Sequence, residues 1–271
     1  MESWVDGQPA DALSLKDRGL AYGDGLFETI AVRGGQPVLL ERHLCRLADG
    51  CSRLAITADH SLIHREVLAY AAALGEGVLK LILTRGDSLR GYAPDPAAQP
   101  HRILQGNPPA AYPAVHGQQG IRLFPCATRL SEQPLLAGLK HLNRLEQVLA
   151  RSEWQDAEYA EGLMLDLHGR VIEGVFSNLF LVRDGELLTA DLSRCGVAGV
   201  MRAELLFQAR QLGIATHITD ISLDQLQQAD EIFVCNSVYG VWPVRAYAAL
   251  SWPVGPLTRK LQGIARALLD A

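Results

Sequence analysis

The spacing of hydrophobic positions divides the first third of the chain into strands and helices. Apolar residues dominate "GLFETIAVRGGQPVLL" at residues 25–40, and the central Gly34–Gly35 pair predicts two strands joined by a tight turn. Leucines then recur at helical spacing through residues 40–56, which predicts a first helix, and a second helix is expected over residues 60–74. A strand at "GVLKLILTRG" (residues 77–86) follows this helix pair.

A segment rich in proline and glycine separates this part from the remainder. "GYAPDPAAQPHRILQGNPPAAYPAVHG" contains one short strand pattern, "HRILQ", and its later prolines are typical of a linker. We therefore expect a smaller N-terminal α/β domain at residues 1–110 and a linker at residues 111–120. A larger C-terminal domain at residues 121–271 is expected to carry Lys140.

The second half of the chain again mixes both periodicities, so the fold class predicted is α/β or α+β in two domains. Its predicted elements are a strand at residues 121–127, a helix after Asn143, a meander of strands over residues 161–190, helices at residues 199–213 and 222–229, and a strand at residues 230–237.

Composition narrows the classes of function. The 271 residues are 48% hydrophobic and 20% charged, which is ordinary for a soluble globular protein. A net charge of −5 provides no basic field for nucleic acid or anionic lipid, so neither partner is favoured. We find no signal-peptide pattern at the N-terminus and no apolar run long enough for a transmembrane helix.

The cysteines and histidines give no support for a metal centre. The five cysteines are scattered and never form a CxxC pair, which fits reduced thiols in a cytoplasmic protein. The eight histidines form no HExxH-like ligand set, and neither a GxGxxG nor a Walker A motif is present. We therefore expect no bound metal.

Lys140 is the first residue that indicates chemistry. It lies in the apolar approach "LLAGLK" to the helix that follows Asn143, and no other charge separates it from Glu132. Loss of solvation in such surroundings favours the uncharged, reactive form of a lysine amine. The alternative is a surface lysine that happens to lie beside a helix.

Several weaker signals together describe a site for a phosphate group. The predicted helix at "GVMRAEL" begins after Gly199, and the amides of Val200 and Met201 at its N-terminus would favour an anion. Arg42 and Arg46 lie one turn apart on the first helix, and either could add a guanidinium. Ser237 at the end of an apolar strand could add a hydroxyl. The alternative reading of Gly199 is an ordinary glycine before a helix.

Glu173 lies in "RVIEGVFSNLFLV", where nearly all its neighbours are apolar. A carboxylate in such a strand is costly unless it faces a cation or a site. A protonated pyridine nitrogen would be a suitable partner. The alternative is a glutamate on an edge strand that faces water.

A reactive lysine, a phosphate-binding site and a buried carboxylate together are typical of a pyridoxal phosphate site. The sequence resembles the fold-type IV pyridoxal phosphate enzymes, which include branched-chain aminotransferases, D-amino acid aminotransferases and 4-amino-4-deoxychorismate lyases. The resemblance covers nearly the whole chain and rests on six segments in order: "DRGLAYGDGLFETI" at residues 17–30, "ERHLCRL" at 41–47, "KHLNRLEQVLA" at 140–150, "EGVFSNLF" at 173–180, "GVMR" at 199–202 and "ADEIFVCNSVYGVWPV" at 229–244.

The resemblance implies a role for each of these site residues. Lys140 would form the covalent link to the cofactor, and Glu173 would pair with its pyridine nitrogen. Asn178 would organise the strand that follows Glu173. The resemblance assigns the phosphate to the Arg46 side chain, the amides of Val200 and Met201, and the Ser237 hydroxyl. Met201 departs from the pattern, because aminotransferases of the class usually carry a threonine there. Without that hydroxyl, the backbone amide of Met201 would be its only contact with the phosphate.

Within the class, the motifs are most similar to the lyase branch. Leu145 stands where branched-chain aminotransferases have a tyrosine, and Thr29 stands where they tend to have a glycine. The implied reaction converts 4-amino-4-deoxychorismate to 4-aminobenzoate and pyruvate, a step toward folate. Lys140 would remove the proton from the amine-bearing carbon, and either Lys140 or Thr29 could protonate the departing group.

The substrate contacts and the assembly follow from the same resemblance. It implies that the substrate is bound by Arg90, Phe27 and Asn236, although Arg90 could equally be a solvated loop residue. It also implies a homodimer. Two other functions remain open, namely an aminotransferase of the same class and an inactive relative that only binds a ligand. Retention of both Lys140 and Glu173 argues against the inactive relative.

Overall fold

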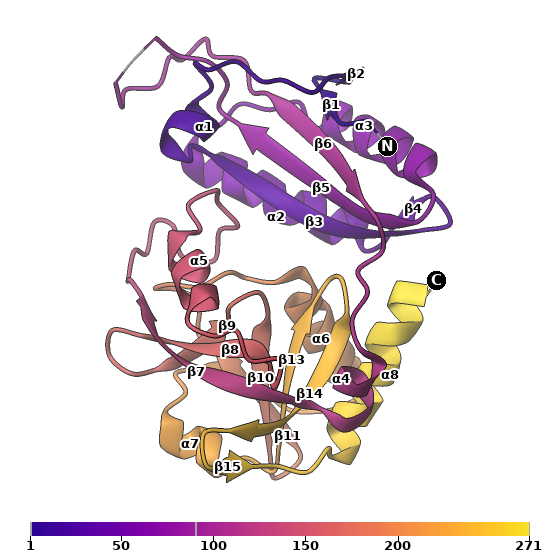
Figure 1. Cartoon of the computed structure of the whole chain (residues 1–271), viewed down its shortest axis with the longest axis vertical. Helices are drawn as coiled ribbons and strands as arrows, with labels where there is room; N and C mark the ends of the chain where they lie inside the picture. The colour runs from indigo at the N-terminus through magenta and orange to yellow at the C-terminus, as the bar shows by residue number, and fades with distance from the viewer. Residues whose placement is uncertain (1, 90, 271) are drawn as a thin grey trace. The chain divides into compact units, whose positions relative to one another are not determined.

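The structure is a computed structural model that describes residues 2–89 and 91–270 (Figure 1). Its chain forms two compact units. The N-terminal unit contains the residues up to Ala110 together with Leu139–Asn143, and the C-terminal unit contains Ala111–Gly138 and Arg144–Asp270. The sequence-based division was therefore wrong in placing Lys140 in the C-terminal domain. The expected linker at residues 111–120 also belongs to the C-terminal unit, where Ala114–Gln119 forms helix α4.

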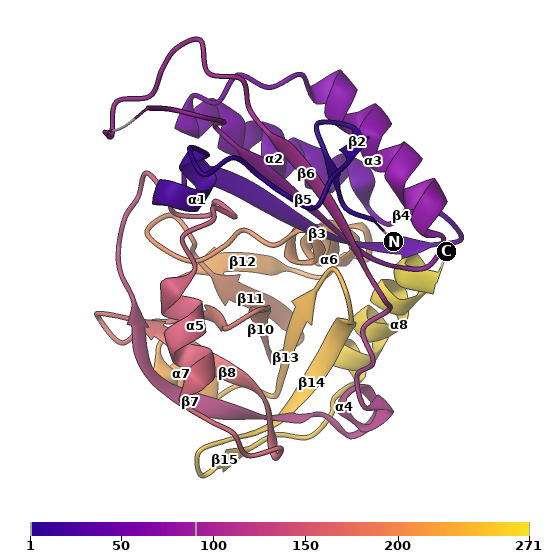
Figure 2. The ribbon, with the colours of Figure 1, turned by 45° about the horizontal axis from the view of Figure 1, so that its top comes forward.

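The N-terminal unit is built on an antiparallel sheet, which has six strands in the described part of the chain, in the order β2-β1-β6-β5-β3-β4. Helices α2 and α3 lie side by side over one face of it (Figures 1 and 2). The strand pair, both helices and the following strand are confirmed. The elements are β1 (Trp4–Val5), β2 (Gln8–Pro9), α1 (Arg18–Tyr22), β3 (Gly25–Arg33), β4 (Gln36–Pro37), α2 (Leu40–Leu54), α3 (His60–Leu74), β5 (Gly77–Thr84) and β6 (Arg102–Asn107).

Strand β3 presents different side chains to its two faces. Successive side chains of a strand point in opposite directions, and Leu26 and Glu28 are buried whereas Phe27 and Thr29 are only half-buried. Leu26 packs against α2 so closely that a Cβ on Gly50 would come within 2.7 Å of it. Glu28 therefore points toward α2, and Phe27 and Thr29 lie on the opposite face of the sheet.

The C-terminal unit contains a strongly curved sheet. Among the described residues its nine strands include β12-β11-β10-β13-β14-β7-β8-β9 in order, with β15 paired to β14. Asn178 of β10 also pairs with Glu173 of β9, which closes β10-β13-β14-β7-β8-β9 into a ring. The strands are β7 (Ile121–Leu130), β8 (Tyr159–Asp166), β9 (Val171–Gly174), β10 (Asn178–Arg183), β11 (Glu186–Ala190), β12 (Thr216–Thr219), β13 (Glu231–Asn236), β14 (Gly240–Tyr247) and β15 (Leu250–Ser251).

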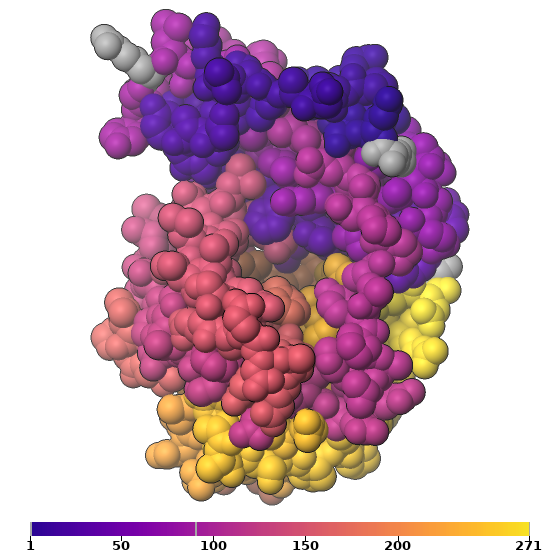
Figure 3. Space-filling view, in the orientation of Figure 1, coloured from indigo at the N-terminus to yellow at the C-terminus, as the bar shows by residue number. Residues whose placement is uncertain are grey.

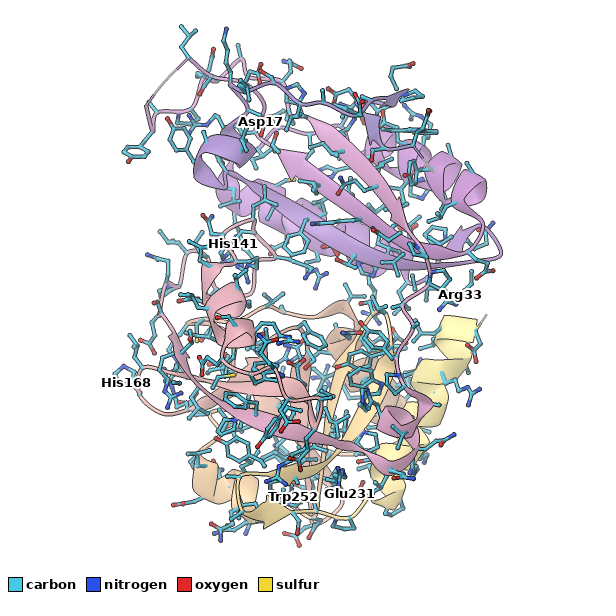
Figure 4. The ribbon with its side chains drawn as sticks, viewed as in Figure 1. Asp17, Arg33, His141, His168, Glu231 and Trp252 are labelled. Carbon is cyan, nitrogen blue, oxygen red and sulfur yellow. The ribbon has the colours of Figure 1, made fainter. Side chains whose placement is uncertain are left out.

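The remaining helices belong to this second unit and are α5 (Leu145–Ser152), α6 (Val200–Gln211), α7 (Leu223–Gln227) and α8 (Pro256–Asp270). The first three were predicted, and Ser222 caps α7. Helix α8 was not predicted. Its first turn is held by Glu231, whose carboxylate accepts the amide hydrogens of Leu257 and Thr258 at 3.2 and 2.7 Å (Figure 4). None of the helices in the described ranges has the length and hydropathy needed to cross a membrane.

Helix α5 differs from an ordinary core helix. Its apolar residues Leu145, Val148 and Leu149 are 75%, 59% and 58% exposed, whereas the small residue Ala150 is buried. The chain around this helix lies at the surface in Figure 3. The amphipathic pattern therefore predicted the helix correctly, but its apolar face is not covered within this chain.

Candidate active site

The segment that carries Lys140 is attached to β3 by backbone hydrogen bonds. The amide of Phe27 donates to the Lys140 carbonyl at 2.9 Å, and the amide of Leu142 donates to the Gly25 carbonyl at 3.0 Å. His141, which lies between these bonds, forms a bridge with β3 (Figure 4). A side chain at Gly25 would collide with the neighbouring strand, because its Cβ would lie 2.4 Å from the Leu83 carbonyl. These contacts explain why Lys140 packs with the N-terminal unit.

The Lys140 side chain lies against an aromatic ring. Its Nζ is 4.2 Å from the centroid of Phe27, and the side chain is half-buried. A second ammonium, Lys80 Nζ, lies 5.5 Å from the same ring. Thr29 pairs with Lys80 across β3 and β5 and shares the face of Phe27. The structure thus brings Lys140 together with Phe27, and places Thr29 two residues further along the same face.

Of the two candidate arginines Arg42 and Arg46 on α2, the structure shows Arg46 bound to a buried carboxylate. Arg46 donates from Nε to Glu28 Oε1 at 2.8 Å and from Nη2 to Glu28 Oε2. His43 lies on the same side of α2 and contacts Glu28 Oε2 through Nδ1 at 2.6 Å. Sequence reasoning missed Glu28 and His43. Glu28 could have been identified in the same way as Glu173, because it too is a carboxylate within an apolar strand.

Glu173 lies on β9, which pairs with both β8 and β10 in the C-terminal unit. Its side chain is 3% exposed, and Oε2 accepts the Val197 amide at 2.9 Å and Asn178 Nδ2 at 3.3 Å. Asn178 Nδ2 also donates to the Val197 carbonyl at 2.8 Å. The alternative of an edge-strand glutamate facing water is wrong. Asn178 organises the strand around Glu173.

The N-terminus of α6 is shaped by the same asparagine. Gly199 is its N-cap and makes no side-chain cap hydrogen bond. A Cβ on Gly199 would lie 2.0 Å from Asn178 Oδ1, so only glycine permits this approach. Buried Arg202 ties the first turn to β11 by donating to Thr189 Oγ1 at 3.2 Å and to the Ala190 carbonyl at 2.8 Å. The backbone amides at the start of α6 are therefore held in a fixed arrangement.

Ser237 lies in the turn between β13 and β14, and Asn236 builds that turn. Asn236 Oδ1 accepts the amides of Val238 and Tyr239 at 2.9 and 3.0 Å, and its Nδ2 donates to the Phe176 carbonyl at 3.3 Å. Its amide group is therefore engaged in shaping the loop. The third expected substrate contact, Arg90, lies outside the described residues.

Glu161 is a buried carboxylate that the sequence analysis did not single out. It accepts the amide of Val175 at 2.9 Å and the Ser177 hydroxyl at 2.7 Å, both in the turn between Glu173 and Asn178. Burial raises the pKa of Glu161 to about 7, although these hydrogen bonds oppose the shift. Glu161 therefore fixes the turn that connects the two residues of the Glu173 motif.

The chain is similar in sequence to proteins of one family. The sequence profile of the amino-transferase class IV family matches residues 25–247. Aminodeoxychorismate lyase of Vibrio harveyi is 38% identical over 268 residues, covering 96% of this chain and 98% of that protein. A putative branched-chain-amino-acid aminotransferase of Methanocaldococcus jannaschii is 29% identical, covering 97% and 94%.

Solved structures give the same result. The crystal structure of 4-amino-4-deoxychorismate lyase from Pseudomonas aeruginosa is 65% identical, with a TM-score of 0.98 over 99% of this chain and 100% of that one. A branched-chain amino acid aminotransferase of Escherichia coli shares the fold at 24% identity, with a TM-score of 0.85 over 99% of this chain and 94% of that one.

Proposed function

The chain belongs to the amino-transferase class IV family, and on this basis we propose that it is a pyridoxal-phosphate-dependent lyase. It converts 4-amino-4-deoxychorismate to 4-aminobenzoate and pyruvate. The observation that carries this proposal is the 65% identity to a 4-amino-4-deoxychorismate lyase across nearly the full length of both chains. Leu145 and Thr29, which differ from the residues usual in branched-chain aminotransferases, support the same choice.

The residues of each unit fit pyridoxal phosphate. In the C-terminal unit, the uncapped start of α6 offers amide hydrogens to an anion, and the approach at Gly199 excludes any larger residue. The Glu173 carboxylate is buried, which suits a partner for a protonated ring nitrogen. In the N-terminal unit, the Lys140 amine lies over the Phe27 ring rather than in bulk water.

When bound, the cofactor supplies an electron-withdrawing ring that stabilises negative charge on the amine-bearing carbon of the substrate. Lys140 would hold the cofactor covalently, and its amine would accept the proton from that carbon. Glu173 would keep the proton on the ring nitrogen. The residues that would hold the phosphate are Arg46 through its side chain, Val200 and Met201 through their amides, and Ser237 through its hydroxyl.

The departing group and the substrate carboxylates need further partners from the chain. Lys140 or Thr29 delivers the proton to the departing group. Phe27, whose ring contacts the Lys140 amine, forms part of the substrate site. Lys80, on the same face of the sheet as Phe27, supplies a cation for a substrate carboxylate. Asn236 contributes by fixing the loop that bears Ser237.

We expect purified enzyme and aminodeoxychorismate to yield 4-aminobenzoate and pyruvate in equal amounts, without a keto-acid acceptor. Loss of the leaving group makes the substrate ring aromatic. We therefore expect this elimination to be faster than the protonation that transamination requires. Both products are quantified by chromatography. A parallel reaction contains D-alanine or L-leucine with 2-oxoglutarate. Fast transamination there, with no 4-aminobenzoate in the first reaction, would identify an aminotransferase, and inactivity in both would identify the inactive relative.

We further propose that the enzyme is a cytoplasmic homodimer. All five cysteines in the described chain are free thiols, which supports a reducing compartment. The exposed apolar face of α5, formed by Leu145, Val148 and Leu149, supports burial against a second copy. Analytical ultracentrifugation at micromolar concentration should give the mass of a dimer, and a monomer under these conditions would contradict the proposal.

A further inference from the structure

A buried cluster of three polar side chains joins α2 to β3 in the N-terminal unit. Glu28 lies at its centre and receives the planar fork of Arg46, with Nε at 2.8 Å from Oε1 and Nη2 on Oε2. His43 reaches Oε2 through Nδ1 at 2.6 Å. Because an ionised carboxylate only accepts hydrogen bonds, the proton of the imidazole is assigned to Nδ1.

The charges of the cluster are fixed by its surroundings. Burial alone would raise the pKa of Glu28, but the charge and hydrogen bonds of Arg46 and the hydrogen bond of His43 lower it to about 2. Burial lowers the pKa of His43, and the positive charges of Arg46 and Lys140 lower it further, against the opposing effect of Glu28. The cluster at neutral pH therefore consists of a carboxylate, a guanidinium and a neutral imidazole.

Packing alone does not account for a histidine at this position. The His43 side chain is 0% exposed, and its Nε2 has no hydrogen-bond partner among the described residues. A buried imidazole with an unsatisfied nitrogen is less favourable than an apolar side chain of similar size. What His43 provides that an apolar residue cannot is its hydrogen bond to Glu28.

The geometry points to His43 as a positioning residue for cofactor binding. His43 holds the Glu28 carboxylate in the plane that receives Arg46, and Glu28 in turn holds the guanidinium in one orientation toward the cofactor phosphate. A guanidinium is rigid and planar, so fixing two of its nitrogens on Glu28 fixes the direction of its other N–H groups. The inference rests on the proposed function, in which Arg46 binds the phosphate.

The sequence builds this arrangement from two simple periodicities. Glu28 is directed to α2 by the alternation of β3, whose neighbours Phe27 and Thr29 point to the other face. His43 and Arg46 are three residues apart, so they lie on the same side of α2. The close packing of α2 on β3 at Gly50 keeps the helix near enough for both to reach Glu28.

The test compares pyridoxal phosphate with pyridoxal, which lacks the phosphate. Cofactor-free enzyme is titrated with each, and dissociation constants are measured for wild type, His43→Leu and His43→Asn. Leucine removes the donor, whereas the asparagine amide lies close to the position of Nδ1 and retains it. For His43→Leu we expect the dissociation constant of pyridoxal phosphate to rise about tenfold and that of pyridoxal to change by less than about twofold. His43→Asn should stay near wild type for both.

His64 offers a matched control, because it also contacts a glutamate, Glu41, at 3.3 Å but on the surface. His64→Gln should leave both dissociation constants unchanged. Should His43→Leu fail to fold, His43→Gln takes its place, since the glutamine amide lies beyond the Nδ1 position.

The outcomes that contradict the inference differ from the one that contradicts the proposed function. Equal weakening of both ligands, no weakening of either, or an asparagine variant as weak as leucine would overturn the positioning role of His43. A wild-type enzyme that binds neither ligand would refute the proposed function and the inference together.

Discussion

Replacing Lys140 by alanine should abolish turnover and remove the link between chain and cofactor that borohydride reduces. The side chain serves twice in the proposed reaction, as covalent anchor and as the base that takes the proton from the substrate. A positioned acid–base group alone contributes on the order of 10²- to 10⁴-fold, so Lys140→Ala should lose at least that much. Some cofactor should stay bound through its phosphate, because the phosphate contacts lie on other residues.

The measurement combines steady-state rates with borohydride reduction and peptide mapping. In wild type the reduced cofactor should be found on the peptide that contains Lys140, and in Lys140→Ala no labelled peptide should be recovered. Lys16→Ala and Lys260→Ala are controls and should keep both the rate and the label. Recovery of the label on Lys16, Lys80 or Lys260 in wild type would show that the site assignment is wrong.

Glu173→Gln should lower the turnover number on the order of 100- to 1000-fold, the effect typical of losing one preorganised electrostatic group. Oε2 of Glu173 already accepts hydrogen bonds from Val197 and Asn178. A glutamine must turn its carbonyl toward these two donors, and its amide nitrogen then replaces Oε1. An amide N–H cannot keep a proton on the cofactor nitrogen, so the ring loses its capacity to accept negative charge.

The rate loss of Glu173→Gln should exceed its loss of cofactor affinity, because the phosphate contacts remain. Both are measured on the same preparation, by turnover and by titration of the cofactor-free enzyme. Glu186→Gln removes a surface carboxylate, which pairs with His217 in the same unit, and should change neither quantity. If Glu173→Gln turned over at the wild-type rate, Glu173 would have only a structural role and the prediction would be wrong.

The features that could be predicted from the sequence are those that depend on local patterns of residues. Strand β3, helix α2 and helix α3 follow from periodicity over consecutive residues, and the structure confirms them. Glu173 could be identified because its sequence neighbours are apolar, which made an ionised side chain there costly in any fold. In both cases the information lay within a few residues of the position concerned.

The features that the sequence did not reveal depend on partners far along the chain. Helical spacing alone leaves Arg42 and Arg46 equivalent, and the resemblance assigned the phosphate to Arg46. The sequence did not reveal the partner of Arg46, which is Glu28 on another element. Lys140 was placed in the wrong unit because its segment has no periodicity and is assigned by two backbone hydrogen bonds to β3. Glu161 acts on a turn that follows it by more than ten residues.

The attachment of Leu139–Asn143 to β3 also constrains the order of events during synthesis. The N-terminal unit cannot complete this edge of its sheet when Ala110 has been made, because residues 111–143 must still be translated. At ~5–20 residues per second this takes roughly 2–7 s, during which the backbone groups of Gly25 and Phe27 that bind the segment remain unpaired. A ribosome-bound chain ending near residue 110 therefore exposes a short strand edge that the finished protein covers with its own lysine-bearing segment.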